Sequence, residues 1–410
     1  MQSGPENTRP FGATKALKLN MPVIWKVLFS ALLLADSIGF SLLYTVPAAG
    51  PYVLIPLAIL SILAMSFRTR DLSAGVAMII PAAAFWLLSG SYVPAALWVL
   101  LLTIVGLGAY LLRCLPVWQW LFIPVLAAGI GALVSGGALL AILLCLFAFP
   151  AAYALYAAVA GARSKVGAIV MVAGALLLTL IALVLIALYL RHGKLDRELL
   201  QTVVDTYRAE LRAQLKATLD TQLSVYQSVG YEVAIDTASY AAQITDAVFN
   251  LVPGILVLFS LVVGWCVQPI PYILHIRTDP EAVLPLNARA FSLSPLTAIV
   301  FLICQIPTFF VDIASSLATI VMANLALILF PGLALLGLGS FFTIWDLRRG
   351  RARKGGSPKG FIVFMVLVLS LAGGCSFAYY ILLIAAFYGS YTILFTAIRS
   401  LIPKRPRDEE

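Results

Sequence analysis

The sequence predicts an all-α membrane protein, a polytopic bundle of about twelve transmembrane helices with one helical hairpin on the extracytoplasmic side. Of its 410 residues, 62% are apolar and only 11% are charged, whereas about a quarter of the residues in a soluble domain are charged. The apolar residues occur in runs of roughly 17 to 25 without period-two alternation, which favours helices over a barrel. Backbone groups cannot bond to water in hydrocarbon, so each span must satisfy them within its own helix.

The apolar runs divide at turn residues and charges into two bundles separated by a polar segment. About seven helices are expected over residues 23–190 and about five over 248–398, with cytoplasmic tails at 1–22 and 399–410. The expected spans are Val23–Tyr44, Pro51–Phe67, Leu72–Leu88, Pro94–Leu112, Val117–Val134, Ala138–Ala160, Val166–Leu190, Val248–Leu274, Pro295–Val311, Ala314–Trp345, Gly360–Gly374 and Ser376–Ile398.

Basic residues indicate the orientation of these spans, because Lys and Arg in short loops stay in the cytoplasm. With the expected spans, all basic clusters fall on one side, and opposite short connections such as Thr45–Gly50 carry no charge. The clusters are Lys15, Lys18 and Lys26; Arg68 and Arg70; Arg113; Arg163 and Lys165; Arg277 and Arg289; Arg348–Lys354; and Arg399–Arg407. We expect a multi-pass protein of the cytoplasmic membrane with both termini in the cytoplasm.

The same alternation decides how two ambiguous segments are interpreted. Residues Ala314–Trp345 are expected to form one long helix kinked at Pro331, because two spans there would place the following basic cluster outside. Residues 360–398 are too long for one span. They are expected to cross twice, turning at Gly373 and Gly374, and a re-entrant pair is the alternative.

The polar segment 191–247 is expected to be an acidic helical hairpin outside the cytoplasm. Apolar residues recur in it every three or four positions, which is typical of an amphipathic helix. They are Leu200, Val204, Tyr207, Leu211, Leu215 and Leu219. A break at Gly230 and a second arm from Asp236 complete the hairpin. Its apolar stripe either packs on the second arm, docks an extracytoplasmic partner or covers a substrate path.

Asp36 is the strongest candidate for a binding residue, because it is the only ionisable residue deep inside an expected span. A mid-membrane Asp costs about 2.5–3.5 kcal/mol on insertion scales, and such residues commonly bind an ion, a proton or a substrate group. The alternative is a structural residue, protonated or hydrogen-bonded. Asp312 at an outer turn and Asn324 inside a span are weaker candidates for the same role, with helix capping and helix–helix hydrogen bonding as alternatives.

The sequence lacks the residue patterns that other functional classes require. The two histidines, His192 and His275, lie at opposite membrane edges, and no Cys or His spacing fits a metal site. No P-loop occurs, so an ATP-driven step would need a partner. The net charge of +9 lies mostly between spans and does not imply nucleic acid. We expect no enzyme activity, no cofactor and no metal, with the lipid bilayer as the surrounding partner.

Several stretches carry a resemblance to a known family. The stretch TVPAAGPYVLIPLAILSILAMSFRTRDLSAGVAMIIPAAAFWLLSG, ending at Gly90, combines a Pro/Gly outer turn, a Pro-containing short span, a basic turn and a small-residue span. The segments NLVPGILVLFSLVVGW and PLNARAFSLSP, and Asn324 followed by FPGLALLGLG, continue the pattern. In this order the chain resembles the YybS-like predicted membrane proteins. That family of unknown function is distantly similar to the substrate-binding S components of energy-coupling-factor vitamin transporters.

The resemblance implies a small-molecule-binding membrane subunit that docks on a transmembrane coupling protein with ATPases. In S components docking uses small residues of the first helix, which here would be Ala31 and Ala35. The chain departs from S components in its larger number of expected spans and in the hairpin. We therefore expect a membrane transport protein or a substrate-binding subunit. The alternative is a non-transporting scaffold or assembly factor that recruits a cell-envelope partner through the hairpin.

Overall fold

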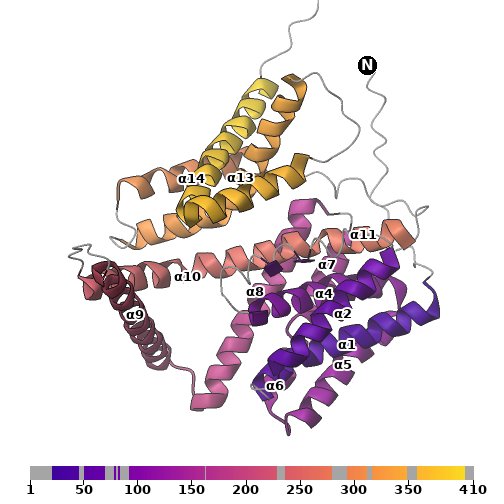
Figure 1. The fold of residues 1–410 in the computed structure, drawn as a ribbon. Helices are drawn as coiled ribbons and strands as arrows, with labels where there is room; N and C mark the ends of the chain where they lie inside the picture. The colour runs from indigo at the N-terminus through magenta and orange to yellow at the C-terminus, as the bar shows by residue number, and fades with distance from the viewer. Residues whose placement is uncertain are drawn as a thin grey trace, which may run out of the picture. The chain divides into compact units, whose positions relative to one another are not determined.

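The computed structural model describes residues 21–45, 50–69, 78–79, 82–83, 92–161, 163–228, 236–278, 293–311, 316–348 and 358–401. Every regular element among these residues is a helix (Figure 1). The chain forms two compact units, Met1–Gly193 with Ser260–Ala290, and Lys194–Phe259 with Phe291–Glu410. The long helix α10 (Thr237–Val267) therefore contributes residues to both units.

The first unit is built around α4 (Tyr92–Cys114), most of whose side chains are buried. A helix that is apolar on all sides belongs in the interior of a bundle. α4 packs on α1, α2, α7 and α11, while α5 packs on α1 and α6, and α8 packs on α7. The surrounding helices are α1 (Val23–Thr45), α2 (Gly50–Thr69), α5 (Val117–Val134), α6 (Leu139–Leu146), α7 (Phe149–Ala160), α8 (Lys165–His192) and α11 (Pro269–Thr278).

Two glycines of α4 let its neighbours approach closely. A Cβ on Gly106 would lie 2.8 Å from Cγ2 of Ile270 on α11. A Cβ on Gly108 would lie 3.0 Å from Cβ of Ala152 on α7. Small residues at helix contacts allow the van der Waals packing that holds membrane bundles together.

Basic side chains gather at one end of the first unit. Lys26 lies in the first turns of α1, whereas Arg68 and Arg113 lie in the last turns of α2 and α4. The charges of all three act on the thiol of Cys114. Three residues that the sequence places on one side of the membrane therefore lie at the same end of this unit. That this end faces the cytoplasm stays a prediction.

The second unit contains a closely packed pair, α13 (Leu317–Arg348) and α14 (Pro358–Leu401), with α12 (Pro295–Gln305) against both. Gly337 and Gly389 lie where the pair crosses. A Cβ on Gly337 would overlap the carbonyl oxygen of Ala385, and a Cβ on Gly389 would overlap that of Leu333. The backbones of α13 and α14 can touch here only because both positions are glycine. The helix α9 (Arg197–Ser228) and the first part of α10 complete the unit.

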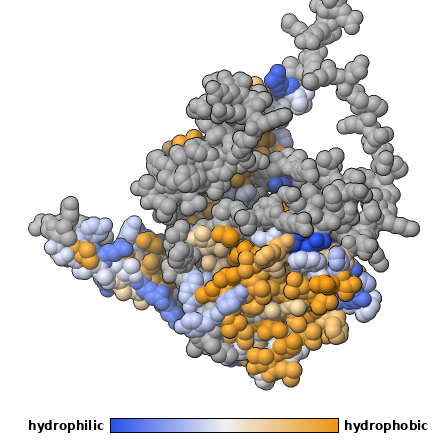
Figure 2. All heavy atoms as spheres, turned by 45° about the vertical axis from the view of Figure 1, so that its right-hand side comes forward, coloured by the Kyte–Doolittle hydropathy of each residue, from blue (hydrophilic) through white to orange (hydrophobic). Residues whose placement is uncertain are grey.

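Within the described residues, eight helices are long and apolar enough to cross a membrane. They are Val23–Leu42, Tyr92–Cys114, Val117–Val134, Leu139–Ala160, Lys165–His192, Thr237–Pro271, Leu317–Ser340 and Tyr379–Ser400. Two shorter apolar helices, Tyr52–Arg68 and Pro295–Phe309, overlap expected spans, whereas Leu72–Leu88 lies mostly outside the described residues. Figure 2 shows a broad apolar surface, as lipid-facing helices require. These helices indicate a membrane protein, but the expected total of about twelve spans is not confirmed.

α14 differs from the sequence expectation. It runs without interruption from Pro358 to Leu401, so the expected turn at Gly373 and Gly374 is absent. A glycine inside a helix costs only about 1 kcal/mol relative to alanine, and the apolar residues on both sides continue the helix through the pair. A helix that crosses once separates its two ends, so charge alternation does not place both basic clusters that flank α14 on one side. α13, by contrast, continues through Pro331 as expected.

Candidate functional site

Asp36 lies in the interior of the first unit, where α1 meets α2. Its side chain is fully buried, and Oγ of Ser61 lies 3.1 and 2.9 Å from its two carboxylate oxygens. The same hydroxyl lies 2.9 Å from the carbonyl oxygen of Leu57. A hydroxyl carries one proton, so Ser61 can donate fully to only one of these oxygens at a time. Among the described Lys and Arg side chains, none forms an ion pair with Asp36.

This environment suits a carboxyl group that takes up a proton, a cation or a polar group of a ligand. An ionised carboxylate in an apolar interior is costly unless it is paired, and one shared hydroxyl does not neutralise it. Two more buried hydroxyls lie on α1, where Ser37 donates to the carbonyl of Leu33 at 2.6 Å and Ser41 to that of Ile38 at 2.9 Å. Their protons are used within α1, but their lone pairs can still accept.

The helices around Asp36 are irregular and closely packed. Pro56 lies inside α2, and because it has no N–H it interrupts the hydrogen-bond ladder shortly before Ser61. One turn beyond Asp36, a Cβ on Gly39 would lie 3.1 Å from Cδ1 of Leu57. Tight packing of α1 on α2 therefore fixes the separation between the carboxylate and its hydroxyl partner.

Asn324 lies on α13 in the second unit and bonds to α10. Its Oδ1 accepts the N–H of Gly254 at 2.6 Å, and its Nδ2 donates to the carbonyls of Asn250 and Ile320, both at 2.8 Å. The Asn250 carbonyl and the Gly254 N–H are the two groups that bond to each other in a regular helix. The carboxamide thus inserts into the ladder of α10 beside Pro253. Both amide hydrogens are used, which leaves none to donate to a ligand.

The other candidates are placed as follows. Asp312 lies outside the described residues. Ala31 is exposed and lines a hollow of about 720 Å³ between α1 and α5, and Ala35 is half-buried one turn further along α1. Five residues separate Ala31 from Asp36, about 140° around a helix of 3.6 residues per turn. The hollow and the buried carboxylate therefore lie on different faces of α1.

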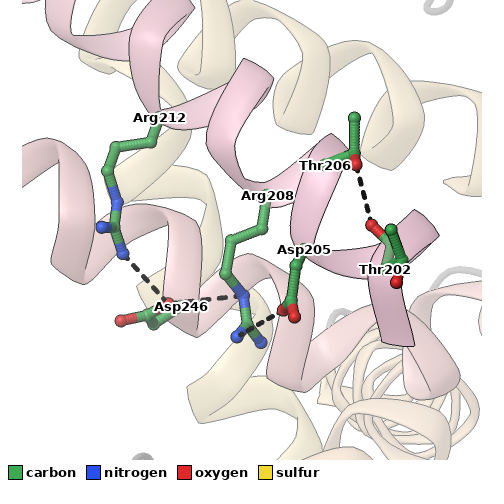
Figure 3. A network of polar contacts seen from close by, with 6 residues as sticks. All are labelled: Thr202, Asp205, Thr206, Arg208, Arg212 and Asp246. Carbon is green, nitrogen blue, oxygen red and sulfur yellow. Dashed lines mark hydrogen bonds and ion pairs between the residues drawn. The ribbon is translucent and has the colours of Figure 1, made fainter. Parts of the chain in front are cut away.

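Charged side chains join α9 to α10 (Figure 3). Arg208 Nε and Arg212 Nη2 lie 3.6 and 3.7 Å from Oδ1 of Asp246. Arg208 also lies 5.3 Å from the ring centroid of Phe249 and 3.9 Å from Asp205. All four charged groups are more than a third exposed, so each ion pair is worth at most about 1 kcal/mol.

The apolar stripe of α9 is covered unevenly along the helix. Its first three residues, Leu200, Val204 and Tyr207, are 38%, 43% and 57% exposed, whereas the next three, Leu211, Leu215 and Leu219, are half-buried. Contacts with the second arm lie in this later part, where Asp220 accepts a hydrogen bond from Thr237 of α10. The earlier part of the stripe is therefore the part that is left uncovered within the described residues.

No family model, curated protein or solved structure matches this chain. The resemblance to YybS-like proteins is therefore neither supported nor contradicted. The roles of the residues are inferred from their own geometry.

Sequence reasoning found Asp36 but missed the groups around it. Ser61 lies 25 positions away on α2 and gives no signal of its own, because serines are common in membrane helices. The insertion of Asn324 into α10 could have been suspected from Pro253 and Gly254, which weaken a helix that also faces an Asn-containing span. The hollow beside Ala31 has no sequence signal, because it depends on how α1 and α5 pack.

Proposed function

We propose that this chain is a membrane transport protein, or the substrate-binding membrane subunit of a transporter, in which Asp36 binds a proton, a cation or a polar group of a small molecule. The observation that carries this proposal is the complete burial of Asp36 with one described side-chain partner, Ser61. Ionisable residues inside membrane bundles are costly and commonly mark ion or substrate paths. The interruption of α2 at Pro56 supports the proposal, because transporter sites use irregular backbone of this kind.

The sequence limits the energy source of this transport to two alternatives. The chain carries no P-loop, so transport would draw either on an ion gradient acting at Asp36 or on ATPases of a coupling partner, as the S-component resemblance implies. In the proposed orientation, the end of the first unit that carries Lys26 and Arg113 faces the cytoplasm.

Mass spectrometry of small molecules released from the purified protein tests this proposal. The wild type should carry a small molecule that is depleted in Asp36→Asn and retained in Asp246→Asn, which removes an exposed carboxylate on α10. Comparable recovery of that molecule from Asp36→Asn and the wild type, with both proteins folded, would contradict the role of Asp36.

A second candidate function is a scaffold that recruits an extracytoplasmic partner. It is favoured by α9, a helix of 32 residues with an apolar stripe and no buried side chain. Deleting residues 195–246 should then abolish capture of a cell-envelope protein, while Asp36→Asn leaves it intact. Capture that persists without the segment would eliminate this candidate.

A further inference from the structure

A hollow between α1 and α5 lies beside the basic end of the first unit. It measures about 720 Å³, within the roughly 300–1,000 Å³ typical of small-ligand sites. Its walls are mainly apolar, with Val27, Leu34, Phe122 and Leu126 among them, and Lys26 and Gln119 lie toward the starts of the two helices. The hollow thus has a polar mouth and an apolar interior.

The depth of the hollow matches one leaflet of a bilayer. It extends along α1 from Val23 to Leu34, eleven residues or about 16 Å at 1.5 Å per residue. Half of a hydrocarbon core of about 30 Å is about 15 Å. A lipid chain of one leaflet would fill a hollow of this depth, whereas a transmembrane helix of a partner would need a groove of twice the length.

Two cations lie at the mouth of the hollow. Lys26 lines it, and Arg113 precedes its lining residue Leu115 by two positions. Arg68 lies 5.5 Å from the ring of Trp25, which is on the opposite face of α1 from the lining residues, so Arg68 is not part of the mouth. Lys26 and Arg113 are therefore the cations that lie where a lipid headgroup would be.

These cations lack acidic partners. Neither forms an ion pair with a carboxylate of the described residues. Nη1 of Arg113 is shielded from solvent and has no hydrogen-bond partner in this part of the chain. A guanidinium donor that lacks a partner favours an added anion, and phosphate oxygens suit Arg geometry especially well.

We propose that this hollow binds an anionic phospholipid, with an acyl chain against the apolar walls and the phosphate on Lys26 and Arg113. Basic pockets between transmembrane helices bind acidic headgroups in this way. The same hollow contains Ala31, the residue that the family resemblance assigns to partner docking. A bound lipid would cover that face of α1.

Native mass spectrometry of the full-length protein in detergent tests this assignment. Phosphatidylglycerol should bind more tightly than phosphatidylcholine with the same acyl chains. Each removed cation should weaken phosphatidylglycerol binding about fivefold, so Lys26→Gln with Arg113→Gln should weaken it about 25-fold without changing phosphatidylcholine binding. Arg163→Gln, which removes an exposed cation between α7 and α8, serves as the matched control and should leave binding unchanged.

A second variant tests the apolar part of the site and serves if the double variant fails to fold. Ala31→Trp adds bulk at an exposed position that lines the hollow, and it should weaken both lipids. Glycerol phosphate alone should not compete with the lipid. Equal affinity for the two lipids, unchanged binding in the charge and Ala31 variants, displacement by glycerol phosphate, or a second protein cross-linked at position 31 in place of lipid would each overturn the assignment.

Discussion

Replacing Asn324 by alanine should loosen the contact between α10 and α13 by about 1 to 3 kcal/mol. The change removes two interhelical hydrogen bonds, to the Gly254 N–H and the Asn250 carbonyl. Such bonds in membranes average about 0.6 kcal/mol and reach about 1.7 kcal/mol. Part of the loss is offset if the two backbone groups bond to each other in a straighter α10. Unfolding in detergent gives the free energy, and hydrogen exchange at the Gly254 amide reports the local change.

Asn250→Ala is the matched control for this prediction. Only the backbone carbonyl of Asn250 bonds to Asn324, so the substitution should leave stability and Gly254 exchange close to the wild type. Gly254→Ala should resemble Asn324→Ala, because its Cβ would lie 2.5 Å from Oδ1 of Asn324. The two changes should not add in the double variant, because each disrupts the same contact. Unchanged Gly254 exchange in Asn324→Ala, or equal damage from Asn250→Ala, would refute the insertion.

Three further predictions concern the second unit. Gly389→Ala should lower the free energy of unfolding in detergent by about 1–3 kcal/mol, an amount typical of overpacking. Gly339→Ala is the control and should not lower it, because its added Cβ would have no atom within 4 Å. Equal effects of the two substitutions would argue against the close crossing of α13 and α14. Asp246→Asn should leave global stability within about 1 kcal/mol but speed hydrogen exchange along α9, because it removes both ion pairs to α10. Exchange along α9 at the wild-type rate would contradict a role of these ion pairs in holding α9. Asp196 accepts hydrogen bonds from Lys194 and from the N–H of Leu199, which hold its pKa below the usual 3.8. The carboxylate should therefore stabilise the start of α9 fully above pH 3.8, and this stabilisation should be lost as the pH falls through the lowered pKa. Hydrogen exchange at the Leu199 amide reports it. An exchange rate that neither acid nor Asp196→Ala changes, beyond the intrinsic effect of pH, would contradict the role of Asp196 as a helix cap.

The helical class of the protein was predictable from composition, but the limits of single helices were not. An apolar run can continue or turn at a small-residue pair for nearly the same free energy, so Gly373 and Gly374 did not decide between two helices and one. Pro331 lies inside α13 for a related reason, since neighbouring membrane helices can satisfy the carbonyl that a proline frees.

The sequence predicted a residue of the candidate site only where its polarity differs from that of the apolar run around it. Asp36 is conspicuous because a carboxylate inside an apolar run must be explained, whereas Ser61 is an ordinary residue in such a run. The sequence likewise shows that Lys26 and Arg113 lie near helix ends, but not that both lie at one hollow. That arrangement depends on the packing of α1, α4 and α5.

Uptake by proteoliposomes that carry the wild type or Asp36→Asn tests the central claim most directly. The vesicles are incubated with a metabolite extract of the host, washed, and analysed by mass spectrometry at equal protein content. Asparagine keeps the shape of the side chain and an acceptor for Ser61 but removes the ionisable group. We predict that uptake of at least one component is lost in Asp36→Asn while thermal stability is equal or higher, because the costly carboxyl is gone. Wild-type uptake by Asp36→Asn, or lost uptake that merely follows lost stability, would contradict a functional role for Asp36.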